Sequence, residues 1–159
     1  MDIDMTGFSA PQQRALFDLL ILAMYADGHL TTVEDEQLQK LLVAFGYTED
    51  FDRQREFDAA VTRMRPFIQS LQKAKERVLS LAEAFTTRSQ QKQVYAAVQQ
   101  LMTTDKHVSS WEGTLLSELG LKFRMRTREI ICGALGELRK CVGERWSRGL
   151  RGGFRIDGT

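Results

Sequence analysis

The stretch ADGHLTTVEDEQL at residues 26–38 is matched, at an offset of 78 residues, by TDKHVSSWEGTLL at residues 104–116. In each stretch a His follows an Asp by two residues, and a Glu follows that His by five. The chain contains two histidines, and both fall at this matched position. One short chain therefore contains the same segment twice, and the fold prediction starts from this repeat.

Each copy has the pattern of a helix end followed by a new helix start. Asp27-Gly28 predicts the end of a first helix, because glycine adopts the left-handed conformation of a helix C-terminus without a Cβ clash. Thr31 and Glu34, three residues apart, form a capping-box pattern that predicts the start of a second helix. Ser109 and Glu112 repeat this pattern in the second copy. Each copy therefore predicts a helical hairpin.

The repeat extends beyond the turns into the apolar residues of both flanking helices. At the same offset, Leu16 matches Val94, Phe17 matches Tyr95, and Phe45 matches Phe123. Neither hairpin can bury its apolar faces alone, so we expect residues 16–45 and 94–123 to pack together around a pseudo-twofold axis. The sequence predicts an all-α, single-domain bundle of six or seven helices.

The other helix boundaries follow from caps and breakers. Ser9 and Gln12 form a capping box, with Pro11 in the first turn, after a flexible segment over residues 1–8. Pro66 marks the end of a third helix or a kink in it, and a fourth helix is expected over residues 67–85. A fifth is expected from about Ser89.

Composition limits the class of protein. The chain has 159 residues, 43% of them apolar, and two prolines, which favours one domain with long helices. The N-terminus lacks the basic residues of a signal peptide, and the longest apolar run, broken by Asp18, is too short for a transmembrane segment. Residues 1–123 are mildly acidic, unlike a nucleic-acid-binding surface. These features predict a cytoplasmic protein without nucleic-acid partners.

Residues 124–159 differ from the rest of the chain. They contain nine basic and four acidic residues, seven of the 12 glycines, and both cysteines, Cys132 and Cys141. A disulfide framework is not expected, and a reducing compartment fits. One extra amphipathic helix over Ile131–Trp146, followed by a disordered end, is the expected structure. Two explanations of the change in composition remain open: an appendage that is atypical of the family, or a shifted reading frame.

The paired turns resemble the TerB-like domain of tellurite-resistance proteins, and the resemblance covers residues 9–123. It implies an all-helical fold and a role in resistance to tellurite and other stresses. It also implies protein partners, including membrane proteins of a tellurite-resistance system, and no established enzymatic activity. Metal binding or sensing has been proposed for the family. The second turn departs from the pattern, since Lys106 stands where the first has Gly28.

Two interpretations of the turns remain open. The capping residues stabilise helix ends, and stability alone can account for them. Alternatively, the turns together bind a divalent metal ion. The first turn resembles the second half of a calcium loop, but Ala23 and Tyr25 stand where that loop needs acidic ligands. Two carboxylates and two imidazoles suit Zn, Mn, Fe or Ni better than Ca. The candidate metal ligands are Asp27, His29, Glu34, Asp105, His107 and Glu112.

The remaining function classes have weaker sequence support. No catalytic triad pattern, Cys/His pair or phosphate-binding glycine loop occurs in residues 1–123, so we expect a non-catalytic protein with no cofactor other than a divalent metal ion. An alternative is a protein-protein interaction module that uses the acidic faces of TVEDEQ and TEDFDRQREFD. A metal-dependent hydrolase is a further alternative. The sequence is compatible with a monomer or a homodimer.

Overall fold

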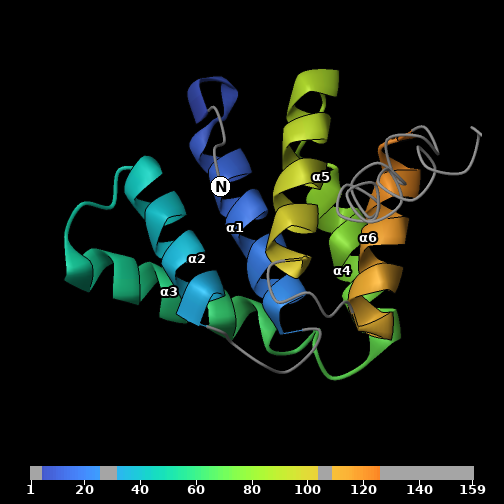
Figure 1. Ribbon diagram of the computed structural model, residues 1–159, viewed down its shortest axis with the longest axis horizontal. Coiled ribbons are helices and arrows are strands. Elements are labelled where there is room, and N and C mark those ends of the chain that lie inside the picture. Colours follow the sequence, from blue (N-terminus) through green and yellow to red (C-terminus); the bar gives the residue numbers. More distant parts are fainter. Residues whose placement is uncertain (1–4, 26–31, 104–108, 126–159) are drawn as a thin grey trace, which may run out of the picture. The chain divides into compact units, whose positions relative to one another are not determined.

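The structure is a computed structural model that describes residues 5–25, 32–103 and 109–125. These residues form six α-helices and no strand, which confirms the all-α prediction (Figure 1). The chain divides into two units, residues 1–125 and 126–159, and the seventh helix expected in the second unit lies outside the described residues. The elements are η1 (Met5–Gly7), α1 (Ala10–Met24), α2 (Thr32–Ala44), α3 (Asp50–Met64), α4 (Leu71–Ala82), α5 (Arg88–Met102) and α6 (Ser110–Lys122).

The helix bounds follow the sequence repeat. Helices α1 and α5 are both 15 residues long, and α2 and α6 are both 13 residues long. Each of the four bounds in the first hairpin lies 78 residues before its counterpart in the second. The superposition of the two hairpins about a pseudo-twofold axis stays a prediction.

The C-terminal ends of α2 and α6 are built in the same way. Gly46 follows α2 with φ +98°, and Arg124, its counterpart at the offset of 78, follows α6 with φ +50°. Both ends are Schellman motifs, in which the chain turns back through a left-handed residue. Their defining bonds run from the Tyr47 N–H to the Leu42 carbonyl, 3.0 Å, and from the Met125 N–H to the Gly120 carbonyl, 2.9 Å.

Helix α1 is the central element of residues 5–125. Every residue from Ala15 to Met24 is buried, as expected from the long apolar run. Helices α2, α3, α4 and α5 all pack against it, so it has neighbours on several sides (Figure 1). A helix in this position is apolar all round rather than along one stripe.

Asp18 is the exception within this apolar helix, and it is buried in an ion-pair network. Its side chain is 3% exposed, and the Arg63 guanidinium from α3 donates to it at 2.8 Å. Arg77 from α4 lies 3.8 Å from its other carboxylate oxygen and stacks over the ring of Phe67, 5.1 Å from the centroid. A buried carboxylate requires such partners, because desolvation without them is costly. Asp18 therefore fixes where α3 and α4 meet α1.

Arg63 also binds a second carboxylate. Its Nη2 lies 2.9 Å from Oε1 of Glu56. Burial alone would lower the pKa of Arg63, but the hydrogen bonds and charges of Asp18 and Glu56 outweigh it and raise the pKa above its ordinary value. Arg63 therefore stays charged, and its hydrogen bonds to Asp18 join α3 to α1.

Three predicted helix boundaries are wrong. Helix α1 ends at Met24 with Tyr25 as its C-cap, before Asp27-Gly28, and helix α4 ends at Ala82 rather than at residue 85. Helix α4 begins at Leu71 rather than at residue 67, because the Ser70 hydroxyl caps it by accepting from the Lys73 N–H at 3.3 Å. The capping box at Ser9, the helix stops at Gly46 and Pro66, and the capping box at Ser109 are confirmed.

Replacing Arg124 with Gly should stabilise the protein by about 1 kcal/mol, because the left-handed conformation costs a non-glycine residue about that much. For a domain of this size the gain corresponds to a rise in melting temperature of about 4 °C. Thermal unfolding followed by circular dichroism measures it. The matched control is Gly46→Ala, which should lower stability. An equal loss for both variants would show that the side chain of Arg124 matters more than its backbone.

Candidate functional site

The predicted metal ligands fall mostly outside the described residues. Asp27, His29, Asp105 and His107 lie there, so the shared metal site stays a prediction. Glu34 lies in the first turn of α2, where only its backbone is described. No group of three or more His, Cys, Asp or Glu side chains that could hold a metal ion occurs among the described residues.

Glu112 is the one candidate ligand whose side chain is described, and it forms a helix cap. Its Oε2 accepts from the Ser109 N–H at 2.6 Å, and the Ser109 hydroxyl accepts from the Glu112 N–H at 3.2 Å. Glu112 is 2% exposed. A carboxylate in the first turn also interacts favourably with the helix dipole. The capping interpretation of Glu112 is therefore confirmed for this helix.

Helices α1 and α5, each of which precedes one of the two turns, pack against each other. At the N-terminal ends of these helices, the side-chain amides of Gln12 and Gln90 donate to each other, with both N–O distances 3.3 Å. These two residues are 78 positions apart, so they are counterparts in the repeat. Each amide also reaches the segment before the partner helix: Gln12 donates to the Ala84 carbonyl at 2.8 Å and Gln90 to the Gly7 carbonyl at 2.6 Å.

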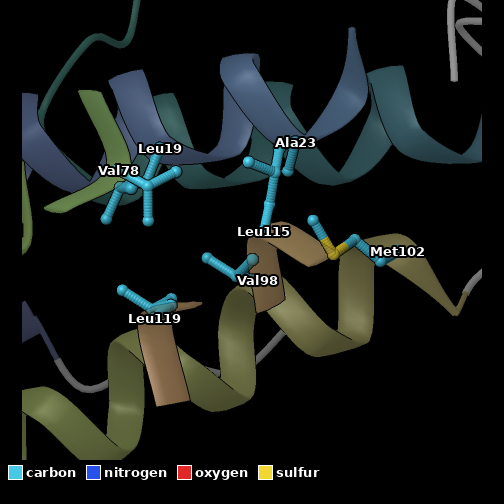
Figure 2. A pocket seen from close by; sticks show the side chains of 7 residues that line it. All are labelled: Leu19, Ala23, Val78, Val98, Met102, Leu115 and Leu119. Carbon is cyan, nitrogen blue, oxygen red and sulfur yellow. The ribbon is translucent and has the colours of Figure 1, made fainter. Parts of the chain in front are cut away.

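The C-terminal ends of α1 and α5 also lie close together. Ala23 and Met102, near the ends of the two helices, line one small void together with Leu115 from α6 (Figure 2). The void has a volume of about 10 Å³ and apolar walls, so it holds at most one water molecule and is no ligand site. It shows instead that side chains from α1, α4, α5 and α6 converge at this end (Figure 2).

Helices α1 and α5 therefore run parallel, because they meet both near their first residues and near their last. Tyr25 caps the C-terminus of α1 and Thr103 caps that of α5. The two segments that carry the repeated Asp and His residues thus start from the same end of one helix pair. This is the arrangement that a site shared between the turns requires.

The Gln12–Gln90 pair was not predicted, although the sequence contains a signal for it. Ser9 and Gln12 form the first capping box, and Thr87 and Gln90 form another at an offset of 78. Extending the repeat from residue 16 back to residue 9 reveals this match. The reciprocal bond itself has no sequence signature, because it depends on how closely the two helices approach.

Tyr95 is an isolated buried hydroxyl in the α5 half of this pair. It is 2% exposed, burial raises its pKa above the ordinary value, and no described residue hydrogen-bonds to its OH group. Its counterpart is Phe17, which fills the matching position without a polar atom. With no base or acid beside it among the described residues, Tyr95 has the environment of a core residue and not of a catalytic one.

Comparisons with protein-family models, with curated proteins and with solved structures find no match to this chain. In the part of the chain that the structure describes, no helix is long and apolar enough to cross a membrane.

Substitutions at Glu112 should separate capping from metal binding. Glu112→Ala should cost about 1 kcal/mol of stability, because the capping box is lost. Glu112→Gln should lower stability less, since Gln12 and Gln90 occupy the same position in the capping boxes at the starts of α1 and α5. Urea unfolding measures both. If Glu112→Gln keeps stability but weakens metal binding, Glu112 is a ligand as well as a cap.

Proposed function

We propose that this protein is a non-catalytic, cytoplasmic, TerB-like binding module that holds a divalent metal ion between its two repeated turns. The proposal includes a role in resistance to tellurite or related stress, as the family resemblance implies. One structural observation carries the metal site: the parallel pairing of α1 and α5, which starts both turns from the same end of the bundle.

The repeat supports a function beyond helix capping. Capping explains a Thr or Ser and a Glu in each copy, and Glu112 forms such a cap. Capping does not explain an Asp and a His at matched positions, Asp27 and His29 in one copy and Asp105 and His107 in the other. These four residues offer two carboxylates and two imidazoles, which suits Zn²⁺, Mn²⁺, Fe²⁺ or Ni²⁺. Glu34 and Glu112 would hold the helix starts that flank the site.

A second candidate function has its own observation. Phe51 at the start of α3 is 76% exposed and lies between acidic residues, with Asp50 and Asp52 on either side of it. Asp50 and Asp52 form ion pairs with Arg53 and Arg55 of the same helix, so the exposed ring is the more distinctive feature. Aromatic residues are enriched at protein interfaces, and this observation favours the interaction-module alternative.

The metal proposal predicts one bound ion per chain. Isothermal titration of the full chain with Zn²⁺ or Ni²⁺ should give a stoichiometry of one, with micromolar or tighter affinity. Replacing His29 and His107 together with Ala should weaken binding at least 100-fold, because half of the ligand set is lost. Affinity should fall as pH decreases through the histidine range, about 6.5, because protons compete with the metal for the imidazoles.

The single variants distinguish one shared site from two separate ones. In a shared site, His29→Ala and His107→Ala each weaken the binding of one ion. In two separate sites the parent binds two ions and each single variant loses one. Far-UV circular dichroism is the control for helical content. If the double variant binds as tightly as the parent, or the parent binds no ion at micromolar concentration, the turns are structural caps only.

A further inference from the structure

A second site lies at the opposite end of the α1–α2 hairpin from its turn. It is a cavity of about 150 Å³ at the junction of α1, the C-terminus of α2, and α3. A cavity of this size accommodates a group about as large as benzene. Its lining comes from α1, from the end of α2 and from α3, and consists of Ala10, Gln13, Arg14, Phe17, Phe45, Tyr47 and Glu56.

Three aromatic residues form part of the wall of this cavity. Phe17 is buried, and its ring meets that of Phe45 edge to face with 6.3 Å between centroids. Tyr47 follows Gly46 in the Schellman motif, and the Arg53 guanidinium binds its carbonyl at 3.2 Å. The cavity is therefore formed before any ligand arrives.

Three features of the cavity favour a cation. Glu56 is 17% exposed and uses Oε1 to bind Arg63, while no described residue donates to its Oε2. The cavity also adjoins the C-terminus of α2, where the last carbonyls carry partial negative charge. Aromatic faces attract cations as well, guanidinium more often than ammonium.

The second repeat shows which group occupies the matching position. Arg88 is the counterpart of Ala10 at the offset of 78. Its guanidinium donates to the carbonyls of Phe123 and Arg124, the residues that match Phe45 and Gly46. In the first repeat Ala10 provides no such donor, and Ala10 is one of the residues that line the cavity.

We propose that the cavity beside Ala10 binds an arginine side chain of a protein partner. The guanidinium would donate to the Phe45 carbonyl at the end of α2 and to Oε2 of Glu56, and its plane and methylenes would pack on Phe45 and Tyr47. The partner would thus supply in trans the group that Arg88 supplies within the second repeat. This site does not include the turns, so its test is separate from the test of the metal proposal.

Arg14 is the one cation that lines the cavity, and it opposes this binding. It is exposed, so water and salt screen its charge. Removal of Arg14 should therefore strengthen the binding of a cation and weaken the binding of an anion, so an Arg14 variant distinguishes the two kinds of ligand.

The test is NMR titration of the full chain with three probes: the peptide acetyl-Gly-Arg-Gly-amide, its glutamate counterpart, and methylguanidinium. The arginine peptide should shift the Ala10 methyl and Tyr47 ring signals and bind more tightly than methylguanidinium, which lacks the methylenes. The glutamate peptide should not bind. Ala10→Arg should abolish binding and raise the melting temperature, because the new side chain fills the cavity as Arg88 does in the second repeat.

Two further variants keep the proposal testable if Ala10→Arg does not fold. Glu56→Gln should weaken binding of the arginine peptide about tenfold, as expected for a lost charge-assisted hydrogen bond. Arg14→Ala should strengthen it, because a like charge beside the cavity is removed. Tighter binding of the glutamate peptide, or weaker arginine binding in Arg14→Ala, would show an anion site and overturn the proposal. Equal binding of methylguanidinium and the arginine peptide would indicate a small-molecule guanidinium site instead of a protein partner.

Discussion

The fold depends on the parallel packing of α1 and α5, and the Gln12–Gln90 amide pair is its most specific contact. Two counterpart residues hydrogen-bond to each other, and each also binds the backbone before the other's helix. Each repeat therefore provides hydrogen-bond partners for polar groups of the other. Buried or half-buried amides are costly when they lack partners, so this pairing selects one alignment of the two helices over slipped ones.

Once α1 and α5 are paired, the positions of the remaining helices are restricted. Helix α1 is buried from Ala15 to Met24, and the one charged residue in that stretch, Asp18, requires cations from two other helices. Arg63 brings α3 to it and Arg77 brings α4. Helices α2 and α6 follow their partners in the two hairpins. The order of helices around α1 thus follows from the need to cover an apolar surface and to neutralise one carboxylate.

The sequence predicted those parts of the fold that have local causes. The caps at Ser9 and Ser109 and the stop at Gly46 are confirmed, because each depends on a few adjacent residues. The predicted end of α1, at Asp27-Gly28, lies too far along the chain. Gly28 is a recognisable helix-end signal, whereas Tyr25, where the helix ends, has no such signal in its residue type. The Asp18 network and the cavity beside Ala10 could not be predicted, because both depend on residues from three helices whose relative positions a single sequence does not specify. The ligand set at the turns remains a prediction from the repeat.

The repeat also provides an internal comparison that a single-copy domain would lack. The two copies differ at three matched positions. The first copy has glycine in the left-handed position, phenylalanine in the core and alanine beside the end of the second helix. The second copy has arginine, tyrosine and arginine at these positions. The third difference leaves a cavity in one copy and a bound guanidinium in the other. Divergence between the copies is where we expect separate functions to have developed.

The central claim is that α1 and α5 run parallel, so that both turns begin at one end of the bundle. Methyl nuclear Overhauser spectroscopy tests it directly, with labelled alanine, valine and methionine methyl groups. The account predicts a cross-peak between the Ala23 and Met102 methyl groups, which lie around the same void. A cross-peak from Ala23 to Val94, near the start of α5, in place of the one to Met102 would show antiparallel helices and turns at opposite ends, which would contradict the account.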